Sequence, residues 1–466
     1  MVFFNLVQVG RLTVRQSPMA GFVAQLAVKH KIPGGAVGIW TKGKEYLACH
    51  GITDLNQPAP IEPGTPFVIA SVTKTFTATA MMRLVADREV ELHAPVQRYL
   101  PDFAVADASA AARITVLNLL NHTSGLDWRA PDRPDNSDNA LARYVAALRD
   151  QQLIAPPGAR TSYSQTGYNV AGRVIEVVTG MTYERAIATL LLEPLRLEHS
   201  TFAPREAITG PVSMGHNVLA DGTVTVANHW KDTRANNPGG GLAASVRDLL
   251  TWAHFHLAGD GGQVLPAREL RQMRNPTAKL VGSSLGDAVG IGWFLRDVGD
   301  VRAFGHAGSA NGQFAEVLIV PDKDFAVVTI ANSGPDNGLA FNRDIVQAGL
   351  ESVAGVTERK AKVMRYKRGV ADEYAGVYEN EIMRATFINT GKALTAEFAI
   401  KPDVRANATT ELPPDMPAAP VALLRGEQDH YIVTDGGLKG QRGYFSRGAS
   451  GKITSVDMAG RVFTRT

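Results

Sequence analysis

Apolar residues along this chain of 466 residues follow two different spacings, and each spacing dominates its own regions. Runs in which apolar residues alternate or follow one another, bounded by glycine, proline and polar turns, predict strands. Such runs lie at 36–41, 45–50, 290–297, 301–306, 314–321 and 325–331. The short turns between successive runs predict antiparallel neighbours.

Elsewhere in the first three quarters of the chain, apolar residues recur at intervals of three and four, which predicts helices. The predicted helices lie at 19–31, from 71 onward, and at 116–120, 138–148, 167–179, 183–192, 245–256 and 338–353. Strands on both sides of a helical region predict one sheet that is built from N- and C-terminal pieces. We therefore expect an α/β domain over 1–357, with a helical insertion at about 75–256.

The last quarter of the chain has a different pattern. Lysine and arginine are frequent over 358–368, which we interpret as a linker. Short alternating segments follow, such as 385–389, 394–398 and 431–434, with turns between them. This pattern predicts a second domain over 369–466, an antiparallel β-sheet or small β-barrel.

Composition narrows the classes of partner. The 48 Lys and Arg residues nearly balance the 45 Asp and Glu residues, without a long basic block, so we expect no nucleic-acid partner. Cys49 is the sole cysteine, which rules out an intrachain disulfide and a thiolate metal cluster. No apolar run reaches the length of about 18 residues that a membrane span needs, so we expect no membrane partner. The start of the chain is apolar but short and lacks a basic leader, which favours a cytoplasmic protein.

Ser71 and Lys74 carry the strongest chemical signal. They stand three positions apart at the predicted start of a helix, so they share one helix face and the amine can take the hydroxyl proton. Burial near the positive end of the helix would lower the pKa of the lysine, as such a base requires. Taken alone, however, such a motif is far more often a capping serine and a solvated lysine.

A serine nucleophile with a lysine base also needs a second proton carrier and a site that stabilises an oxyanion. Two further segments can supply these groups. Tyr163, Ser164 and Gln165 precede a predicted helix, and His306, Ala307 and Gly308 follow a predicted strand. The missing side chain of Gly308 would let a substrate lie against the strand edge.

Together these segments resemble the serine β-lactamase and penicillin-binding-protein family, in the branch of class C β-lactamases, D-aminopeptidases, D-amino-acid amidases and class VIII esterases. The resemblance runs over about 33–348. It rests on Ser71 to Lys74, His122-Thr123-Ser124-Gly125-Leu126, Tyr163-Ser164-Gln165, Glu193-Pro194-Leu195, Gly239-Gly240-Gly241-Leu242 and His306-Ala307-Gly308. It implies a β-lactamase-like fold with the site between its α/β and helical parts, and a lipocalin-like C-terminal barrel.

The resemblance also implies roles for individual residues. Ser71 would be the nucleophile, Lys74 the general base and Tyr163 the proton relay. The backbone N–H groups of Ser71 and Ser309 would form the oxyanion hole, and the reaction would need no metal or cofactor. Gln165, together with the segment of His306 and Gly308, would bind substrate.

Two departures from the family pattern bear on the substrate. Gln165 stands where the family usually has asparagine, and His306 stands where β-lactamases carry a lysine. Loss of that lysine weakens the case for a β-lactam substrate. We therefore predict a serine acyl hydrolase, first of all a peptidase or amidase of D-aminopeptidase type that acts on a small molecule or short peptide. A class VIII-like carboxylesterase, a weak β-lactamase and a slowly acylating penicillin-binding sensor or scaffold are the alternatives, and homo-oligomerisation is left open.

Three other motifs could also indicate a catalytic or metal site, but each has a simpler interpretation. Ser137-Asp138-Asn139 spells a class A β-lactamase motif, but it stands just before a predicted helix, where Ser137 is more simply a cap. The run 282–286 spells the G-x-S-x-G elbow of α/β-hydrolases without the strand and helix that should flank it. His254 and His256 are two apart on a predicted helix and therefore point in different directions.

Overall fold

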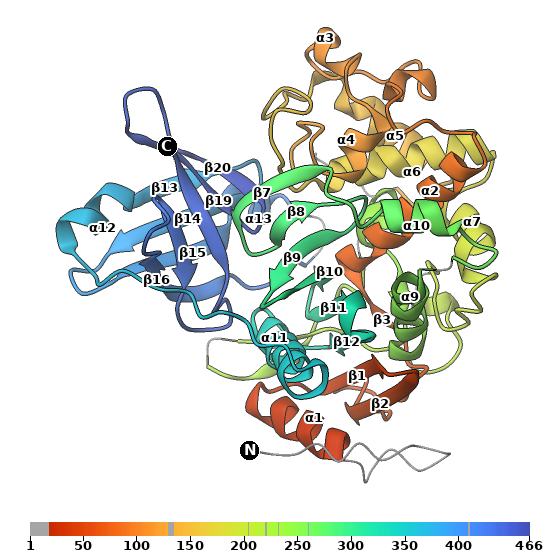
Figure 1. Ribbon diagram of the computed structural model, residues 1–466, viewed down its shortest axis with the longest axis horizontal. Helices are drawn as coiled ribbons and strands as arrows, with labels where there is room; N and C mark the ends of the chain where they lie inside the picture. Colours follow the sequence, from red (N-terminus) through yellow and green to blue (C-terminus); the bar gives the residue numbers. More distant parts are fainter. Residues whose placement is uncertain are drawn as a thin grey trace.

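The computed structural model describes residues 18–128, 135–203, 205–219, 221–231, 233–259, 261–408 and 411–466. These residues form a mixed α/β body and a separate β-barrel, which lies beside the body in Figure 1. The α-helices of the body are α1 Pro18–Lys29, α2 Thr73–Ala86, α3 Ala108–Ala111, α4 Val116–Leu120, α5 Ala140–Ala146, α6 Gln165–Thr179, α7 Tyr183–Ile187, α8 Asn237–Gly240, α9 Val246–Ala258, α10 Ala267–Gln272 and α11 Asn337–Gly349. The first 17 residues, whose composition suggested a cytoplasmic protein, lie outside the described residues.

One eight-stranded antiparallel sheet forms the centre of the body. Its order is β2-β1-β12-β11-β10-β9-β8-β7, so strands from the start of the chain lie next to a strand from far along it. Val37 of β1, for example, pairs with Thr329 of β12. The strands are β1 Gly34–Thr41, β2 Lys44–Gly51, β7 Ala278–Ser283, β8 Gly286–Val289, β9 Phe294–Val298, β10 Val301–Ala310, β11 Gln313–Val320 and β12 Phe325–Ala331. The predicted fold class, an antiparallel sheet with helices and a helical part, is confirmed.

Helices cover both faces of this sheet because its central strands are apolar on both faces. All seven residues of β12 are buried, and they alternate between two cores. Ala326, Val328 and Ile330 join the core that includes α9, whereas Phe325 and Val327 join the core that includes α1 and α11. A strand buried on both faces reads as a continuous apolar run, as the sequence of β12 does.

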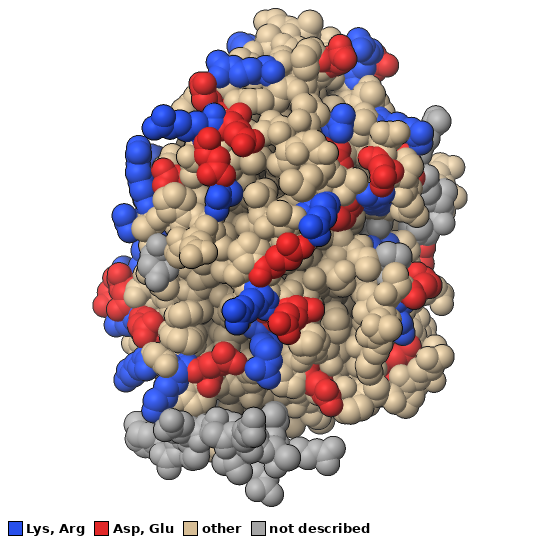
Figure 2. Space-filling model, turned by 90° about the vertical axis from the view of Figure 1, so that its right-hand side faces the viewer, with Lys and Arg blue, Asp and Glu red and all other residues tan. Residues whose placement is uncertain are grey.

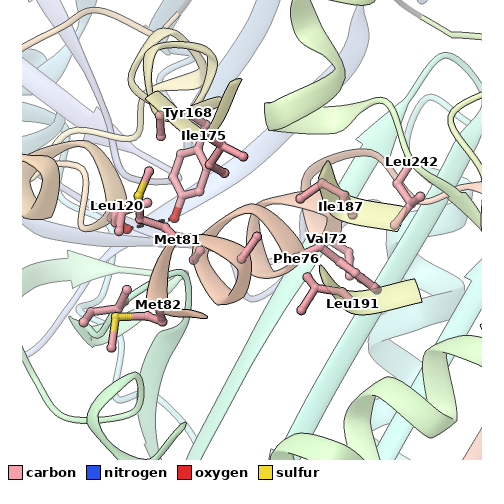
Figure 3. Close-up of a cluster of buried hydrophobic side chains, with 14 of the residues drawn as sticks. Val72, Phe76, Met81, Met82, Leu120, Tyr168, Ile175, Ile187, Leu191 and Leu242 are labelled. Atoms are coloured by element: carbon pink, nitrogen blue, oxygen red, sulfur yellow. Dashed lines mark hydrogen bonds between the residues drawn. The ribbon is translucent and has the colours of Figure 1, made fainter. Parts of the chain in front are cut away.

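Helix α2 is the central helix of the helical part. Apolar or small residues surround it on every side, and 11 of its 14 residues are buried, as expected of a core helix. Figure 3 shows Phe76 among Ile187, Leu191 and Leu242, while Met81 lies toward Leu120 and Tyr168. This packing fixes the position of α2 and therefore also the position of the residues at its start.

The C-terminal region is a closed antiparallel barrel of eight strands. Its strands are β13 Gly376–Glu379, β14 Met383–Asn389, β15 Leu394–Ile400, β16 Met416–Leu423, β17 His430–Val433, β18 Arg442–Arg447, β19 Ile453–Met458 and β20 Arg461–Arg465, and its helices are α12 Arg368–Tyr374 and α13 Pro402–Ala406. Alternate residues such as Tyr378, Phe387 and Tyr431 fill its interior. The predicted antiparallel β-barrel is therefore confirmed; the division at 358–368 and the lipocalin-like character stay predictions.

Shorter elements connect these parts. Two small antiparallel pairs are β3 Phe67–Val68 with β6 Ala243–Ala244, and β4 His216–Val218 with β5 Val224–Val226. Short 3-10 turns lie at Ala70–Val72, Val96–Arg98, Ala147–Asp150, Arg205–Ala207, Arg234–Asn236 and Pro321–Lys323, and π turns at Ala188–Leu192 and Leu350–Ala354. Strand β3 lies shortly before α2 in the chain, and its pairing with β6 fixes the approach to that helix.

The sheet differs from the predicted strands at one edge. The prediction of one strand at 290–297 was wrong at its start, because Gly290 and Gly292 turn the chain and β9 begins at Phe294. Two strands that the sequence pattern did not reveal, β7 and β8, precede that turn as a hairpin. The residues of β7 are half-buried or exposed and β8 is only four residues long, so the apolar alternation of both is weak.

The visible surface carries charges of both signs without a field of one sign (Figure 2), in agreement with the balanced composition. Within the described residues, no helix combines the length and the apolar character needed to cross a bilayer.

Candidate active site

Ser71 lies in the 3-10 turn that joins β3 to α2. The preceding residue, Ala70, has a φ of 45°, a left-handed conformation that is uncommon for any residue other than glycine. Strained backbone of this kind is frequent at active sites, where surrounding packing holds it in place. The Ser71 side chain makes no capping hydrogen bond and is half-buried. The structure therefore does not support the alternative that Ser71 is a helix cap.

Lys74 is fully buried beneath Ser71. Its Nζ lies 2.6 Å from the Gln165 Oε1 atom, 2.6 Å from the Gly239 carbonyl oxygen and 3.2 Å from Ser71 Oγ. The first two oxygens can only accept hydrogen bonds, so a neutral amine spends both hydrogens on them. Its lone pair is then left for the Ser71 hydroxyl, the only one of the three partners that can donate.

Burial and a neighbouring charge favour the neutral form of the Lys74 amine. Desolvation lowers the pKa of Lys74 well below its ordinary value, and the positive charge of Arg461 lowers it further. The carbonyl groups of Gln165 and Gly239 are placed to stabilise the ammonium once a proton has arrived. Such a group can take up a proton from Ser71 and later release it.

Tyr163 lies on the other side of the serine. It is 4% exposed, and its ring centroid is 4.9 Å from Lys74 Nζ. Burial raises the pKa of Tyr163 to about 12, although the charge of Arg461 and the Ser71 side chain oppose the rise. At neutral pH the phenol is therefore protonated, which suits a proton relay and not a tyrosinate base.

Gln165 is brought to Lys74 by the start of helix α6. The Ser164 side chain caps this helix by accepting a hydrogen bond from the backbone N–H of Gly167. The longer side chain of glutamine fits because Gly239 has none: a Cβ atom there would lie 1.9 Å from Gln165 Nε2. The glutamine that replaces the family's asparagine thus still accepts a hydrogen bond from the lysine.

His122 is a site residue to which sequence reasoning gave no role. Its φ is 61°, and its Nδ1 accepts a hydrogen bond from the Ser164 backbone N–H at 3.1 Å. Its ring packs against that of Tyr163 in a tilted arrangement, with centroids 4.6 Å apart and an interplanar angle of 34°. Burial lowers the pKa of His122 far below its ordinary value, so the ring is neutral. A sequence signal for His122 was available, because this residue is the first of a segment on which the family resemblance rests.

Strand β10 brings the predicted segment His306-Ala307-Gly308 close to Ser71. Gly308 is pressed against the nucleophile turn: a Cβ atom at this position would lie 2.1 Å from the Ile69 carbonyl oxygen and 3.0 Å from the Ser71 nitrogen. Ser309 follows on the same strand with an exposed side chain. The backbones of Ser71 and Ser309 therefore lie close together, as two oxyanion-hole donors must.

His306 is buried on the same strand and lies beside Tyr163, with ring centroids 6.2 Å apart. Its Nδ1 is 2.7 Å from the Ala307 carbonyl oxygen, which fixes the proton on that nitrogen. Burial lowers the pKa of His306 to about 3, so the ring stays neutral and is a poor base. Its Nε2 is buried without a hydrogen-bond partner among the described residues.

The structure also brings Arg461, from the barrel, into the site. Its guanidinium carbon lies 4.5 Å from the ring centroid of Tyr163 and 4.6 Å from that of Trp128. The backbone of the barrel makes the adjacent contact, because the Tyr163 N–H donates to the Gly460 carbonyl oxygen at 2.7 Å. Sequence reasoning missed Arg461, and no local motif marks it.

The competing motifs lie in other surroundings. Ser137, Asp138 and Asn139 are exposed, and Asp138 forms an ion pair with Arg234 at 2.6 Å. Ser284 is in the turn between β7 and β8, where it contacts Gln441 of the barrel; a strand does precede the turn, but a second strand and not a helix follows. The 282–286 run is thus no hydrolase elbow.

The two histidines of α9 diverge as predicted. His254 stacks on Trp40 with centroids 3.6 Å apart, whereas His256 is buried near the Thr79 hydroxyl. In the described part of the chain, no three His, Cys, Asp or Glu side chains gather as a metal site requires.

Comparison with known proteins places this arrangement in a family. The beta-lactamase family model matches residues 19–350, about seven tenths of the chain. The chain belongs to the beta-lactamase family. The motifs that carried the resemblance lie within the matched residues, and the family and its solved relatives identify the chain as a serine hydrolase related to β-lactamases and penicillin-binding proteins.

Three relatives of this beta-lactamase family member show how far the similarity extends. Penicillin-binding protein 4 of Amycolatopsis lactamdurans is 32% identical over 71% of this chain and 88% of its own length. The crystal structure of SurE covers 96% of this chain and 98% of its own, with a TM-score of 0.74 and 25% identity, and it has also been solved with D-Leu. The octameric penicillin-binding protein homologue from Pyrococcus abyssi covers 94% of this chain and 97% of its own, with a TM-score of 0.65 and 22% identity, and shows a shared fold.

Proposed function

We propose that the protein hydrolyses amide bonds next to D-amino acids through an acyl-enzyme on Ser71. The observation that carries the proposal is the buried Lys74 amine, which has two short hydrogen bonds to acceptors and its third contact, at 3.2 Å, to Ser71 Oγ. That geometry provides a base for the serine without a metal or a histidine.

Acylation would begin when Lys74 takes the proton of Ser71 while Oγ attacks the carbonyl carbon of the substrate. The backbone N–H groups of Ser71 and Ser309 would stabilise the oxyanion, and Gly308 is the residue that allows them to approach. The protonated phenol of Tyr163 would hand a proton to the leaving amine and be reprotonated from Lys74. Water then replaces the amine as nucleophile and releases the acid by the same steps in reverse order.

The choice of a D-configured amide rests on two observations. SurE, which shares the fold over 96% of this chain, has been solved with D-Leu. In addition, His306 stands where β-lactamases carry a lysine, and burial keeps it neutral. Within this class, the D-aminopeptidase type stays the prediction from sequence, and Gln165 and His306 are proposed as substrate contacts. The octameric homologue supports a proposal of homo-oligomerisation, which light scattering would test.

The test combines labelling and turnover. Mass spectrometry should find one acyl group on Ser71 after brief exposure to p-nitrophenyl acetate, and none in the Ser71→Ala variant. A panel of D- and L-aminoacyl p-nitroanilides, short acyl esters and a chromogenic cephalosporin should show amide turnover with D-preference. Labelling without any turnover would instead favour a slowly acylating sensor, and loss of labelling only in a Ser284→Ala variant would refute the assignment.

A further inference from the structure

The end of the barrel inserts an arginine into the active site. Arg461 is the first residue of β20, and Figure 1 shows β19 and β20 beside β7 at the edge of the body. Its guanidinium lies between the rings of Trp128 and Tyr163, at 4.6 and 4.5 Å from their centroids. The Tyr163 ring that it contacts lies 4.9 Å from Lys74 Nζ, and the charge of Arg461 lowers the pKa of Lys74.

The turn before Arg461 is anchored to the body, so the arginine is held in a defined place. The Gly460 carbonyl accepts a hydrogen bond from the Tyr163 N–H, and Gly460 has a φ of 72°. A Cβ atom at Gly460 would lie 2.7 Å from the side chain of Leu285, in the turn between β7 and β8. The glycine therefore permits both the turn and its close approach to the body.

This arginine forms no close ion pair within the described residues, although the Asp457 charge acts on it. Its hydrogen bond among the described residues goes from Nη1 to the Ala459 carbonyl oxygen at 3.1 Å. Its Nε is buried without a partner, although the side chain as a whole is only half-buried. The nearby Asp457 is an acidic group whose charge acts on Arg461, but burial raises the pKa of Asp457 to about 7, so its carboxyl is only partly ionised at neutral pH. Asp127, beside Trp128, directs its carboxylate to the Trp128 N–H instead.

A buried or half-buried guanidinium without an anion is costly unless a ligand supplies one. We propose that Arg461 binds a carboxylate of the substrate next to the scissile bond. A guanidinium offers parallel N–H donors that match a carboxylate, and the flanking rings fix its plane. The guanidinium of Arg461 would thereby bind the anion. His306 cannot do so, because it is neutral in this chain.

The inference rests on the proposed function and specifies its substrate class. A free carboxylate at this position belongs to the C-terminal residue of a peptide or to a β-lactam. An aminopeptidase substrate presents an ammonium group, which the guanidinium would repel. The charge of the site therefore favours cleavage at a carboxyl-terminal D-residue over release of an amino-terminal one.

The experiment compares matched substrates that differ in this one charge. N-acetyl-D-Ala-D-Ala is compared with its C-terminal amide, and benzylpenicillin with its methyl ester. The readouts are product release and the rate of Ser71 acylation followed by mass spectrometry, so slow turnover does not hide the result. The two pairs distinguish a peptide carboxylate from a β-lactam carboxylate.

We expect the full-length protein to prefer the acid in at least one pair by about ten- to a hundredfold, the range for a charge-assisted hydrogen bond. Arg461→Met should reduce that acid-to-neutral ratio to near one, and Arg461→Lys should retain part of it. Arg425→Met, at an exposed position of the same barrel, should leave the ratio unchanged. Melting temperature and circular dichroism report whether each variant is folded.

Equal rates for acid and neutral partners in the unmodified protein would overturn the inference, as would an equal loss of both in Arg461→Met. Faster turnover of D-Ala p-nitroanilide, with its free ammonium, than of either acid would overturn it as well. In all these cases Ser71 is still acylated and the proposed function survives. Absence of acylation on Ser71 by any probe would refute the proposed function itself.

Discussion

Replacement of Gly308 by alanine should disable the site without unfolding the protein. A Cβ atom at Gly308 would lie 2.1 Å from the Ile69 carbonyl oxygen, whereas ordinary contact begins near 3.4 Å. The difference, 3.4 minus 2.1, means that β10 and the turn of Ser71 must separate by about 1.3 Å. Neither group can rotate away, because both are backbone. Oxyanion-hole donors act within a few tenths of an ångström, so at least one of them should be lost.

Loss of one donor lowers kcat by roughly a hundred- to a thousandfold, or about 2.7–4 kcal/mol of transition-state stabilisation. Separately, overpacking of the strand should lower the free energy of unfolding by about 1–3 kcal/mol, which would appear as a modest fall in melting temperature. The assay is steady-state hydrolysis together with the acylation rate of Ser71, measured with one ester and one amide.

Ala307→Ser is the matched control, because it adds one atom to an exposed position of the same strand. It should keep kcat within about threefold of the original, the size of a small surface effect. If Gly308→Ala also stayed within that range while its circular dichroism and chromatography were normal, β10 would not contribute to the oxyanion hole. The proposed closeness of Ser71 and Ser309 would then be wrong.

Four further outcomes test the proton transfers. Lys74→Ala should lower the acylation rate by about a hundred- to ten-thousandfold, the usual contribution of a general base, and a smaller loss in stopped-flow labelling would contradict its role. Because the base must be neutral, kcat/KM should rise with pH through the lowered pKa of Lys74, well below 10.5, and this limb should move to higher pH in Arg461→Met, which removes a neighbouring positive charge. Tyr163→Phe should reduce amide turnover by about a hundredfold or more, whereas Ser137→Ala should not. The reverse result would assign the proton relay to Ser137 instead of Tyr163. Gln165→Asn should lower kcat by about tenfold, because the shorter amide gives up a 2.6 Å hydrogen bond to Lys74, and unchanged kinetics would show that the bond is dispensable.

Much of the body was predictable because its signals are local. The β12 strand is a continuous apolar run, and the Ser71 to Lys74 turn precedes a helix whose side chains are almost all buried. The hairpin of β7 and β8 escaped prediction for the opposite reason. The residues of β7 are half-buried or exposed and β8 is only four residues long, so the apolar alternation that reveals a strand is weak there.

Gln165 shows a limit of pattern reasoning at the site. Sequence comparison marked it as a departure, since the family's asparagine is one methylene shorter. The amide nevertheless reaches Lys74 because Gly239 leaves space for it, and that glycine belongs to a turn 74 positions further on, 239 minus 165. Whether a longer side chain fits depends on a neighbour that is distant in sequence. A single motif cannot contain that information.

Arg461 marks the same limit more sharply, because a guanidinium in the last strand of a separate barrel carries no local sign of where it points. Its surroundings explain why the two parts of the chain must be considered together. The hydrogen bond from the Tyr163 N–H to the Gly460 carbonyl ties the barrel to the loop that carries the proton relay. The charge that it delivers lowers the pKa of Lys74 and opposes the rise in the pKa of Tyr163. A barrel so connected influences the acid–base chemistry as well as substrate recognition, so its removal should impair acylation even of neutral esters that do not need Arg461 for binding.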